Sequence, residues 1–352
     1  MNELQTLQAS QGATFETISG QTIAQSFGND AAAYTAAQQG LALCDRSHWT
    51  LLRLTGDDRQ QFLHNQTTNQ IQLLQPGQGC ETVFTNSTGR TLDLATVCTG
   101  SEALEVIASP GQGDALMTWL DRYLFPADRV ELHNLTGEFA LFSIWGQPDT
   151  LDGINLDSTQ VGQHCQWEIA GVTVTAITGS GLSLPGYTLK VPQADAAAVW
   201  QSLTQAGAVP LGQTVWEQLR IQDGRPMPGD ELTLDYNALE AGLWRAISFT
   251  KGCYIGQETI ARLNTYQGVK QRLWGVQLTQ AVDVGTAIEM AGKAVGQITS
   301  VSSGLVAEGA IALGYLKTKA GGIGSQVQVG TTQGTIRAVP FVSHDYYEPD
   351  SA

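Results

Sequence analysis

The feature that most constrains the fold is a change of pattern at Arg272. From there onward the chain consists of short β-type runs separated by glycine-rich breaks, and no helical period survives. The runs are LWGVQL, TAIEM, KAVGQITSV, AIALGYLK, SQVQVG and GTIRAVPFV. Short strands with a turn signal every ten or so residues are typical of a small β-barrel or sandwich. We therefore place a domain boundary near residues 268–272.

The preceding part mixes helices and strands without strict alternation. A run of small residues from Asn29 to Leu43 predicts a helix, and Trp49–Gly56 predicts a strand that leads into a helix. ETVFTNSTGRTLDLATV predicts two strands joined by the polar connection Asn86–Gly89. This mixture favours an α+β fold over a doubly wound sheet. The predicted divisions are 1–45 as N-terminal extension and helix, 46–270 as α+β body, 271–343 as barrel, and 344–352 as tail.

Composition excludes several classes of function. The 352 residues carry a formal net charge of -15, which argues against direct contact with nucleic acid, because phosphate binding needs concentrated lysine and arginine. No stretch approaches the roughly 20 apolar residues of a membrane span, and the N-terminus lacks the features of a targeting signal. Five widely spaced cysteines without a CxxC pair predict free thiols and no readable metal site. We expect a cytoplasmic protein that has no contact with membranes.

The stretch SFTKGCYIGQETIAR, Ser248–Arg262, is the strongest candidate for a functional site. Cys253 lies between glycines at 252 and 256, and Lys251 precedes it by two residues. A nearby cation and backbone that a ligand can approach closely would favour a thiolate, acting as nucleophile or soft ligand. An alternative stays open, in which the glycines serve turns and Cys253 fills a crevice. The sequence alone does not decide between them, because no histidine base accompanies the cysteine.

The segment from Arg245 to Arg272, called the basic window below, has a charge opposite to that of the whole chain. It holds one acid, Glu258, and five bases: Arg245, Lys251, Arg262, Lys270 and Arg272. Arginine forks and glycine-exposed N–H groups suit carboxylates and phosphates. The window therefore predicts a site for a small anionic ligand, unless these bases are simply solvated.

The motif KGCYIGQE resembles the signature of the YgfZ branch of the YgfZ/GcvT family. The blocks LLRLTGDDRQQFL, FTNSTGRTLDL, LRIQDGRPMPGDEL and LEAGLWRAISFTKGCYIGQE follow in family order and span most of Leu51–Arg272. The resemblance implies a GcvT-like folate-binding fold, with two interleaved subdomains in the body and a small C-terminal β-barrel. The motif residues are Lys251, Gly252, Cys253, Tyr254, Gly256, Gln257 and Glu258.

The other branch of this family, the aminomethyltransferases or glycine cleavage T-proteins, identifies candidate folate contacts. Asp93 matches an acid near the folate ring, and Arg220 matches an arginine that contacts folate. Pro185 stands where that branch has a folate-contacting glutamate, and proline offers no carboxylate. The resemblance therefore favours the YgfZ branch. The predicted folate-binding residues are Asp93, Arg220, Arg245, Lys251 and Arg262, and the predicted catalytic residue is Cys253.

The resemblance implies that the protein binds tetrahydrofolate or a one-carbon derivative. It also implies a role in assembly or repair of iron-sulfur enzymes, and indirectly in tRNA modification, with iron-sulfur proteins or assembly factors as partners. Two alternatives stay open. One is a folate-dependent aminomethyltransferase, and the other is a regulatory module that binds folate without chemistry.

Overall fold

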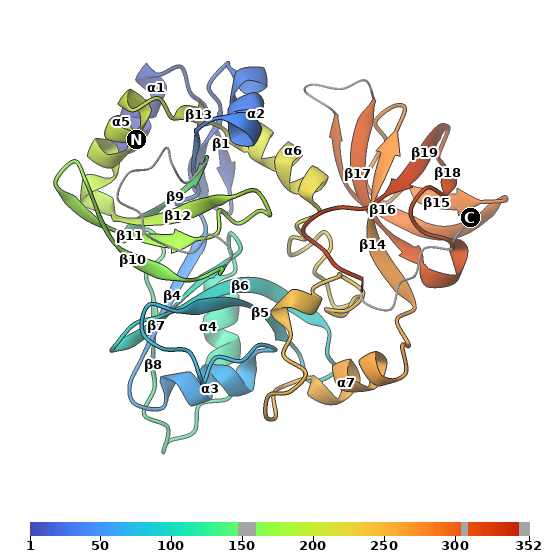
Figure 1. The fold of residues 1–352 in the computed structure, drawn as a ribbon, viewed down its shortest axis with the longest axis horizontal. Coiled ribbons are helices and arrows are strands. Elements are labelled where there is room, and N and C mark those ends of the chain that lie inside the picture. The colour runs from blue at the N-terminus through green and yellow to red at the C-terminus, as the bar shows by residue number, and fades with distance from the viewer. Residues whose placement is uncertain (147–159, 304–308, 345–352) are drawn as a thin grey trace. The chain divides into compact units, whose positions relative to one another are not determined.

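A computed structural model describes residues 1–146, 160–303 and 309–344 (Figure 1). The chain divides into two compact units. The first unit comprises Met1–Thr82 and Ala95–Trp216, and the second comprises Val83–Leu94 and everything from Glu217 onward. The predicted tail therefore lies outside the described residues, except for His344.

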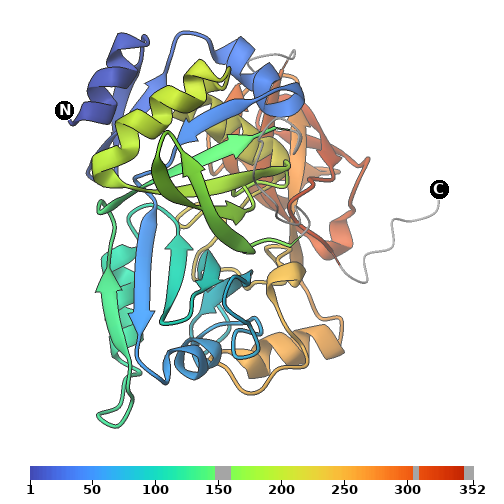
Figure 2. The ribbon, with the colours of Figure 1, turned by 60° about the vertical axis from the view of Figure 1, so that its left-hand side comes forward.

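The first unit is built on a six-stranded sheet of order β10-β11-β12-β9-β3-β13. Adjacent strands in this sheet pair antiparallel, except that β13 pairs parallel with β3. Its strands are β3 (Ala42–Asp45), β9 (Phe139–Trp145), β10 (His164–Ile169), β11 (Val172–Thr178), β12 (Gly186–Pro192) and β13 (Val209–Leu211). One face is covered by α1 (Glu3–Ser10) and α5 (Ala196–Gln205), which lie against each other (Figure 2). Trp200 of α5 is fully buried in this core, edge-on to Phe142 of β9.

The second sheet has the order β5-β6-β7-β4-β8. Its strands are β4 (Thr50–Thr55), β5 (Gly79–Thr85), β6 (Thr91–Thr99), β7 (Ala103–Ala108) and β8 (Glu131–Asn134). Helix α3 (Arg59–Gln66) follows β4, and α4 (Gly113–Asp121) follows β7. Strands β5 and β6 form the predicted hairpin around Asn86–Gly89. Its turn end, residues 83–94, belongs to the second unit.

The C-terminal part is a closed six-stranded barrel, one of the two architectures that its glycine-broken runs predict. The order β14-β17-β16-β15-β18-β19 closes because β14 also pairs antiparallel with β19. Its strands are β14 (Gln271–Leu278), β15 (Ala287–Met290), β16 (Lys293–Ser303), β17 (Ala310–Lys317), β18 (Gln326–Val329) and β19 (Thr332–Arg337). Buried aliphatic side chains such as Val276, Ile288 and Ile336 fill the interior. The fold is thus GcvT-like, a mixed α/β body followed by a small barrel.

After β19 the chain packs back onto the loop that leads to the Cys253 motif. Gly242 adopts φ +74°, and a Cβ there would lie 2.6 Å from Cβ of Val342. The backbone N–H of Ser343 donates to the Gly242 carbonyl at 2.9 Å. His344 then lies beside Trp274, with ring centroids 4.3 Å apart. Only glycine leaves room for this crossing.

Two predicted elements differ from the structure. The predicted helix Asn29–Leu43 is shorter, because α2 spans Asp30–Gln39 and the apolar residues after Gly40 begin β3. A short apolar run is ambiguous between helix and strand, and here strand pairing with β9 decides it. The run CQWEIAGVTVTAI, whose residue types predict a single strand, forms the hairpin β10–β11, since Ala170 and Gly171 form a turn with positive φ.

Candidate functional site

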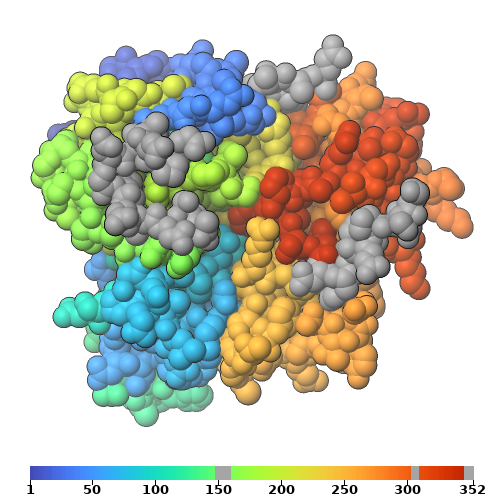
Figure 3. Space-filling view, viewed as in Figure 1, coloured from blue at the N-terminus to red at the C-terminus, as the bar shows by residue number. Residues whose placement is uncertain are grey.

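The motif occupies an exposed loop in the second unit. The loop runs from the short 3-10 helix η3 (Trp244–Ala246) to α7 (Gln257–Thr265), and Cys253 is solvent-exposed within it. The side-chain amide of Gln257 donates to the carbonyl of Gly252 at 3.4 Å. The golden-orange segment containing this loop and α7 reaches the surface in the view of Figure 3. Cys253 is therefore accessible, and does not fill a crevice.

The β5–β6 hairpin holds the end of this loop in place. Gly256 has φ +85°, and a Cβ on it would lie 2.6 Å from the carbonyl oxygen of Asn86. The hydroxyl of Thr85 donates to the Ile255 carbonyl at 2.7 Å. The hairpin therefore occupies the space beside Gly256. A ligand could approach the loop backbone only at other residues.

Lys251 is buried, with 6% of its surface exposed, and its Nζ lies 4.9 Å from the ring centroid of Tyr254. A cation over an aromatic face is attracted by the ring quadrupole. Burial raises the pKa of Tyr254 to about 12, so its hydroxyl stays protonated at neutral pH. The two motif side chains on either side of Cys253 along the chain therefore point into the protein, while the thiol faces solvent.

Asp93 lies on β6 and is completely buried, as expected for an acid in an apolar strand. Its carboxylate accepts the backbone N–H of Leu94 at 2.8 Å. Leu94, Ile221 and Tyr254 belong to one hydrophobic core. The strand with Asp93, the helix with Arg220 and the loop with Cys253 are thus anchored in the same core, and the role of Asp93 in folate binding stays a prediction.

Arg220 lies on α6 (Gln213–Asp223) and is 2% exposed. Its Nε donates to Glu217 at 2.9 Å, and its Nη1 donates to Glu231 at 3.1 Å. Its Nη2 donates to the hydroxyl of Ser300 at 2.8 Å and lies 3.5 Å from the carboxylate of Asp230. Burial would lower the pKa of Arg220, but Glu231 and Glu217 raise it above its ordinary value. Nε, Nη1 and Nη2 each have protein acceptors here.

The acids around Arg220 were not among the predicted site residues. Burial raises the pKa of Asp230 to about 6, and the negative charge of Glu231 is the second cause of this rise. The signal was present in the block LRIQDGRPMPGDEL, where two acids follow the arginine by ten and eleven residues. Helix α6 ends at Asp223, before both acids, so only the folded loop brings these charges to Arg220.

The basic window divides into buried and exposed bases. Lys251 and Arg272 are buried, whereas Arg245, Arg262 and Lys270 are exposed. In the described ranges, no three His, Cys, Asp or Glu side chains are grouped so that they could hold a metal ion. The exposed bases are the ones that can reach an anionic ligand from solvent.

The fold and these motif blocks define the family. The model of the GCVT N-terminal domain matches residues 4–251, and that of the glycine cleavage T-protein C-terminal barrel domain matches residues 271–347. The chain therefore belongs to the glycine cleavage T-protein (GcvT) family. This confirms the resemblance at family level, and the assignment to the YgfZ branch stays a prediction.

Individual relatives agree over nearly the whole length. The Arabidopsis thaliana protein named "Putative transferase At1g60990, chloroplastic" is 40% identical over 341 residues, covering 95% of this chain and 78% of its own. An aminomethyltransferase of Synechococcus elongatus is 29% identical over 339 residues, covering 91% of this chain and 89% of its own. The crystal structure of the glycine cleavage system aminomethyltransferase T from Bartonella henselae aligns with a TM-score of 0.85. That alignment covers 99% of both chains at 20% identity and shows a shared fold.

Proposed function

We propose that the protein is a YgfZ-type, tetrahydrofolate-binding member of the family that supports assembly or repair of iron-sulfur enzymes, and through them tRNA modification. The observation that carries the proposal is the exposed thiol of Cys253, presented by a loop that packs on the hairpin bearing Asp93. An accessible thiol held on a fixed loop suits ligand or redox chemistry. Partners would be iron-sulfur proteins or assembly factors, without direct contact to nucleic acid.

The donor set in the second unit fits folate in part. Asp93 offers a completely buried carboxylate, whose oxygens can accept from a pterin amine in addition to the Leu94 N–H. Arg220 is a poorer candidate than the resemblance implies, because its guanidinium already faces three acids. The anionic tail of folate would therefore be held by Arg245 and Arg262, which are exposed. When bound, tetrahydrofolate supplies a carrier for one-carbon units.

The location is part of the proposal. None of the helices in the described part of the chain combines the length and apolar character that crossing a bilayer requires. We place the protein in the cytoplasm on its sequence features. The Arabidopsis relative is named as chloroplastic. That name describes the relative, and the cytoplasmic location is proposed for this chain alone.

A second candidate function is aminomethyl transfer, which the names of the Synechococcus and Bartonella relatives favour. It would require an acid where Pro185 lies, and this proline is exposed just before β12. A third candidate, a folate-binding regulatory module, differs from the proposal only in what Cys253 does.

The test is anaerobic calorimetric titration with tetrahydrofolate, paired with complementation of cells that lack their YgfZ-type protein. We expect about one site per chain in the wild type, weaker binding in Asp93→Asn and in the double variant Arg245→Gln/Arg262→Gln, and unchanged binding in Cys253→Ser. Only Cys253→Ser should bind folate yet fail to complement. Its matched control is Cys165→Ser, a half-buried cysteine in the first unit.

The outcomes separate the three functions. Complementation by Cys253→Ser would remove the thiol role and leave the regulatory module. Formation of methylene-tetrahydrofolate from an aminomethylated carrier would favour the transferase. Absence of tetrahydrofolate binding at ~1 mM, which means a binding free energy weaker than about -4 kcal/mol, would contradict all three functions.

A further inference from the structure

A cavity of about 350 Å³ lies within the first unit, whereas the Cys253 motif belongs to the second. Its lining side chains come from strands of both sheets of that unit. They include Arg53 of β4, Glu105 of β7, Gln166 of β10 and Lys190 of β12. This volume lies within the range of small-molecule pockets, so a small oxyanion fits with room to spare.

The cavity contains two cations and one closely paired carboxylate. Arg53 Nη2 lies 2.6 Å from Glu105 Oε1, and Lys190 Nζ donates to Glu105 Oε2. Both cations also face the ring of Phe139, with Arg53 Cζ 5.9 Å and Lys190 Nζ 5.0 Å from its centroid. Burial would raise the pKa of Glu105, but Lys190 and Arg53 hold it below its ordinary value. Glu105 is therefore ionised and balances only one of the two positive charges.

Both cations keep hydrogen-bond donors that the protein does not use. Over the described ranges, Arg53 donates to Glu105 from Nε and Nη2, whereas its Nη1 has no protein acceptor. Lys190 donates to Glu105 with one of its three N–H groups. Its side chain is only 11% exposed, so water can satisfy little of the remainder. Removing a charge from water without full pairing is costly, which favours a further anionic acceptor in the cavity.

The charge composition of the first unit makes this concentration unusual. The unit carries six of the 18 basic residues and 19 of the 33 acidic ones, and Lys190 is its only lysine. Two of those six bases line this one cavity. The four charges of the lining, Arg53, Lys190, Glu102 and Glu105, sum to zero, so the attraction for an anion comes from the unused N–H donors of the nearly buried Lys190 and of Arg53.

We propose that this cavity binds a small oxyanion, a carboxylate or a phosphate, held by Arg53 Nη1 and Lys190 Nζ. The neutral side chains of Thr55 and Gln166 are placed to hydrogen-bond the rest of the ligand. Exposed Glu102 at the cavity adds a second negative charge beside Glu105, which selects a singly charged ligand over a multiply charged one.

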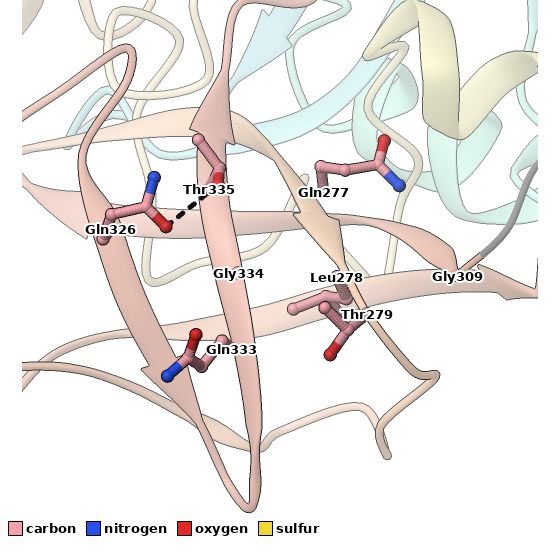
Figure 4. A pocket seen from close by; sticks show the side chains of 8 residues that line it. All are labelled: Gln277, Leu278, Thr279, Gly309, Gln326, Gln333, Gly334 and Thr335. Atoms are coloured by element: carbon pink, nitrogen blue, oxygen red, sulfur yellow. Dashed lines mark hydrogen bonds between the residues drawn. The ribbon is translucent and has the colours of Figure 1, made fainter.

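A second cavity of the same size lies on the barrel and differs from the first in the charge of its lining (Figure 4). Its labelled side chains are neutral, and the hydroxyl of Thr335 donates to the side-chain oxygen of Gln326 at 3.2 Å. Among the residues that the structure describes, the lining of the barrel cavity offers no charged side chain to an anion. It therefore provides an internal comparison for the anion site.

The test measures the midpoint of thermal unfolding of the full chain in sodium acetate, inorganic phosphate and sodium chloride at equal ionic strength. We expect acetate or phosphate to raise the midpoint above its value in chloride, with saturation in the millimolar range. Larger stabilisation by acetate would identify a carboxylate site, and larger stabilisation by phosphate a phosphate site. Equal midpoints in all three salts would overturn the proposal.

Two variants locate the effect. Lys190→Met leaves Glu105 paired with Arg53 and should weaken oxyanion binding at least tenfold, and Arg53→Gln, which keeps the Lys190–Glu105 pair, should do the same. The control is Lys317→Met, an exposed lysine of β17 that donates to the carbonyl of Ala294 at 3.3 Å. An oxyanion effect that survives unchanged in either Lys190→Met or Arg53→Gln would contradict the assignment to this cavity.

Discussion

Arg220 and Glu231 form a buried ion pair in the second unit. Nη1 of the arginine lies 3.1 Å from Oε2 of the glutamate, and the side chains are 2% and 0% exposed. The other carboxylate oxygen accepts the hydroxyls of Thr299 and Ser300, both at 2.6 Å. One glutamate thus ties α6 to strand β16 of the barrel.

Replacing Glu231 with glutamine should lower the free energy of unfolding by about 3 kcal/mol, because it leaves part of the buried Arg220 charge uncompensated. Urea unfolding followed by circular dichroism measures this change. Glu289→Gln, on β15 and half-buried, is the control and should shift stability by less than ~0.5 kcal/mol. Equal effects in the two variants would mean that the pair contributes little.

Gly256→Ala should destabilise the protein by about 3 kcal/mol, since it adds backbone strain at φ +85° and places a methyl group 2.6 Å from the Asn86 carbonyl oxygen. Gly285→Ala is closely matched, because Gly285 also has φ +85° but has no neighbouring atom within 4 Å of an added Cβ. It should cost only the strain, about 1 kcal/mol. Thermal unfolding of both variants isolates the contact with the hairpin. A similar loss in both would show that the hairpin can move aside.

Stability should fall as pH is lowered from about 6.5 towards 4, in part because of His344. Burial lowers the pKa of His344 to about 4, against a smaller opposing effect of the Leu273 carbonyl, which accepts from Nε2 at 2.8 Å. The unfolded chain therefore binds a proton that the folded chain does not. The stabilisation is complete above the unfolded pKa and is lost as pH falls towards the folded one, up to about 3 kcal/mol.

His344→Gln should flatten this pH dependence, as measured by urea unfolding at pH 7.5, 6 and 5. His133→Gln, at an exposed position on β8, is the control and should leave the slope unchanged. His48 acts in the same direction, since burial lowers its pKa to about 3, so part of the slope must remain. An unaltered slope in His344→Gln would show that the C-terminal segment is already detached at neutral pH.

Cys253 should be the first thiol to react with iodoacetamide under native conditions. It is exposed, whereas Cys44 and Cys98 are buried and their pKa values are raised by that burial. Peptide mass spectrometry after short labelling times identifies the modified residue. The fast phase should disappear in Cys253→Ser and persist in Cys165→Ser. Faster labelling of Cys98 than of Cys253 would contradict the structure of the loop.

Most individual elements could be predicted because their signals are local. The alternation in β4 and the turn Asn86–Gly89 each depend on residues within ten positions of one another. Errors arose where local signals were ambiguous, as in the apolar residues after Gly40, which pair with β9 about 100 residues later. The candidate site was predicted as a motif, with the thiol, the glycines and the basic window all visible in sequence.

The sequence by itself determined the fold family, the small all-β C-terminal domain and the presence of the motif, because these depend on patterns and ordered blocks along the chain. Closure of the barrel was decided by the pairing of β14 with β19. Only the tertiary structure decided what each side chain faces. It surrounds Arg220 with three acids, places Lys251 over Tyr254, and sets Lys190 beside Arg53 in one cavity. The helical i,i+3 spacing brings Glu217 to Arg220, but spacing along the chain does not specify the other pairs, because charges meet through space at a few ångströms.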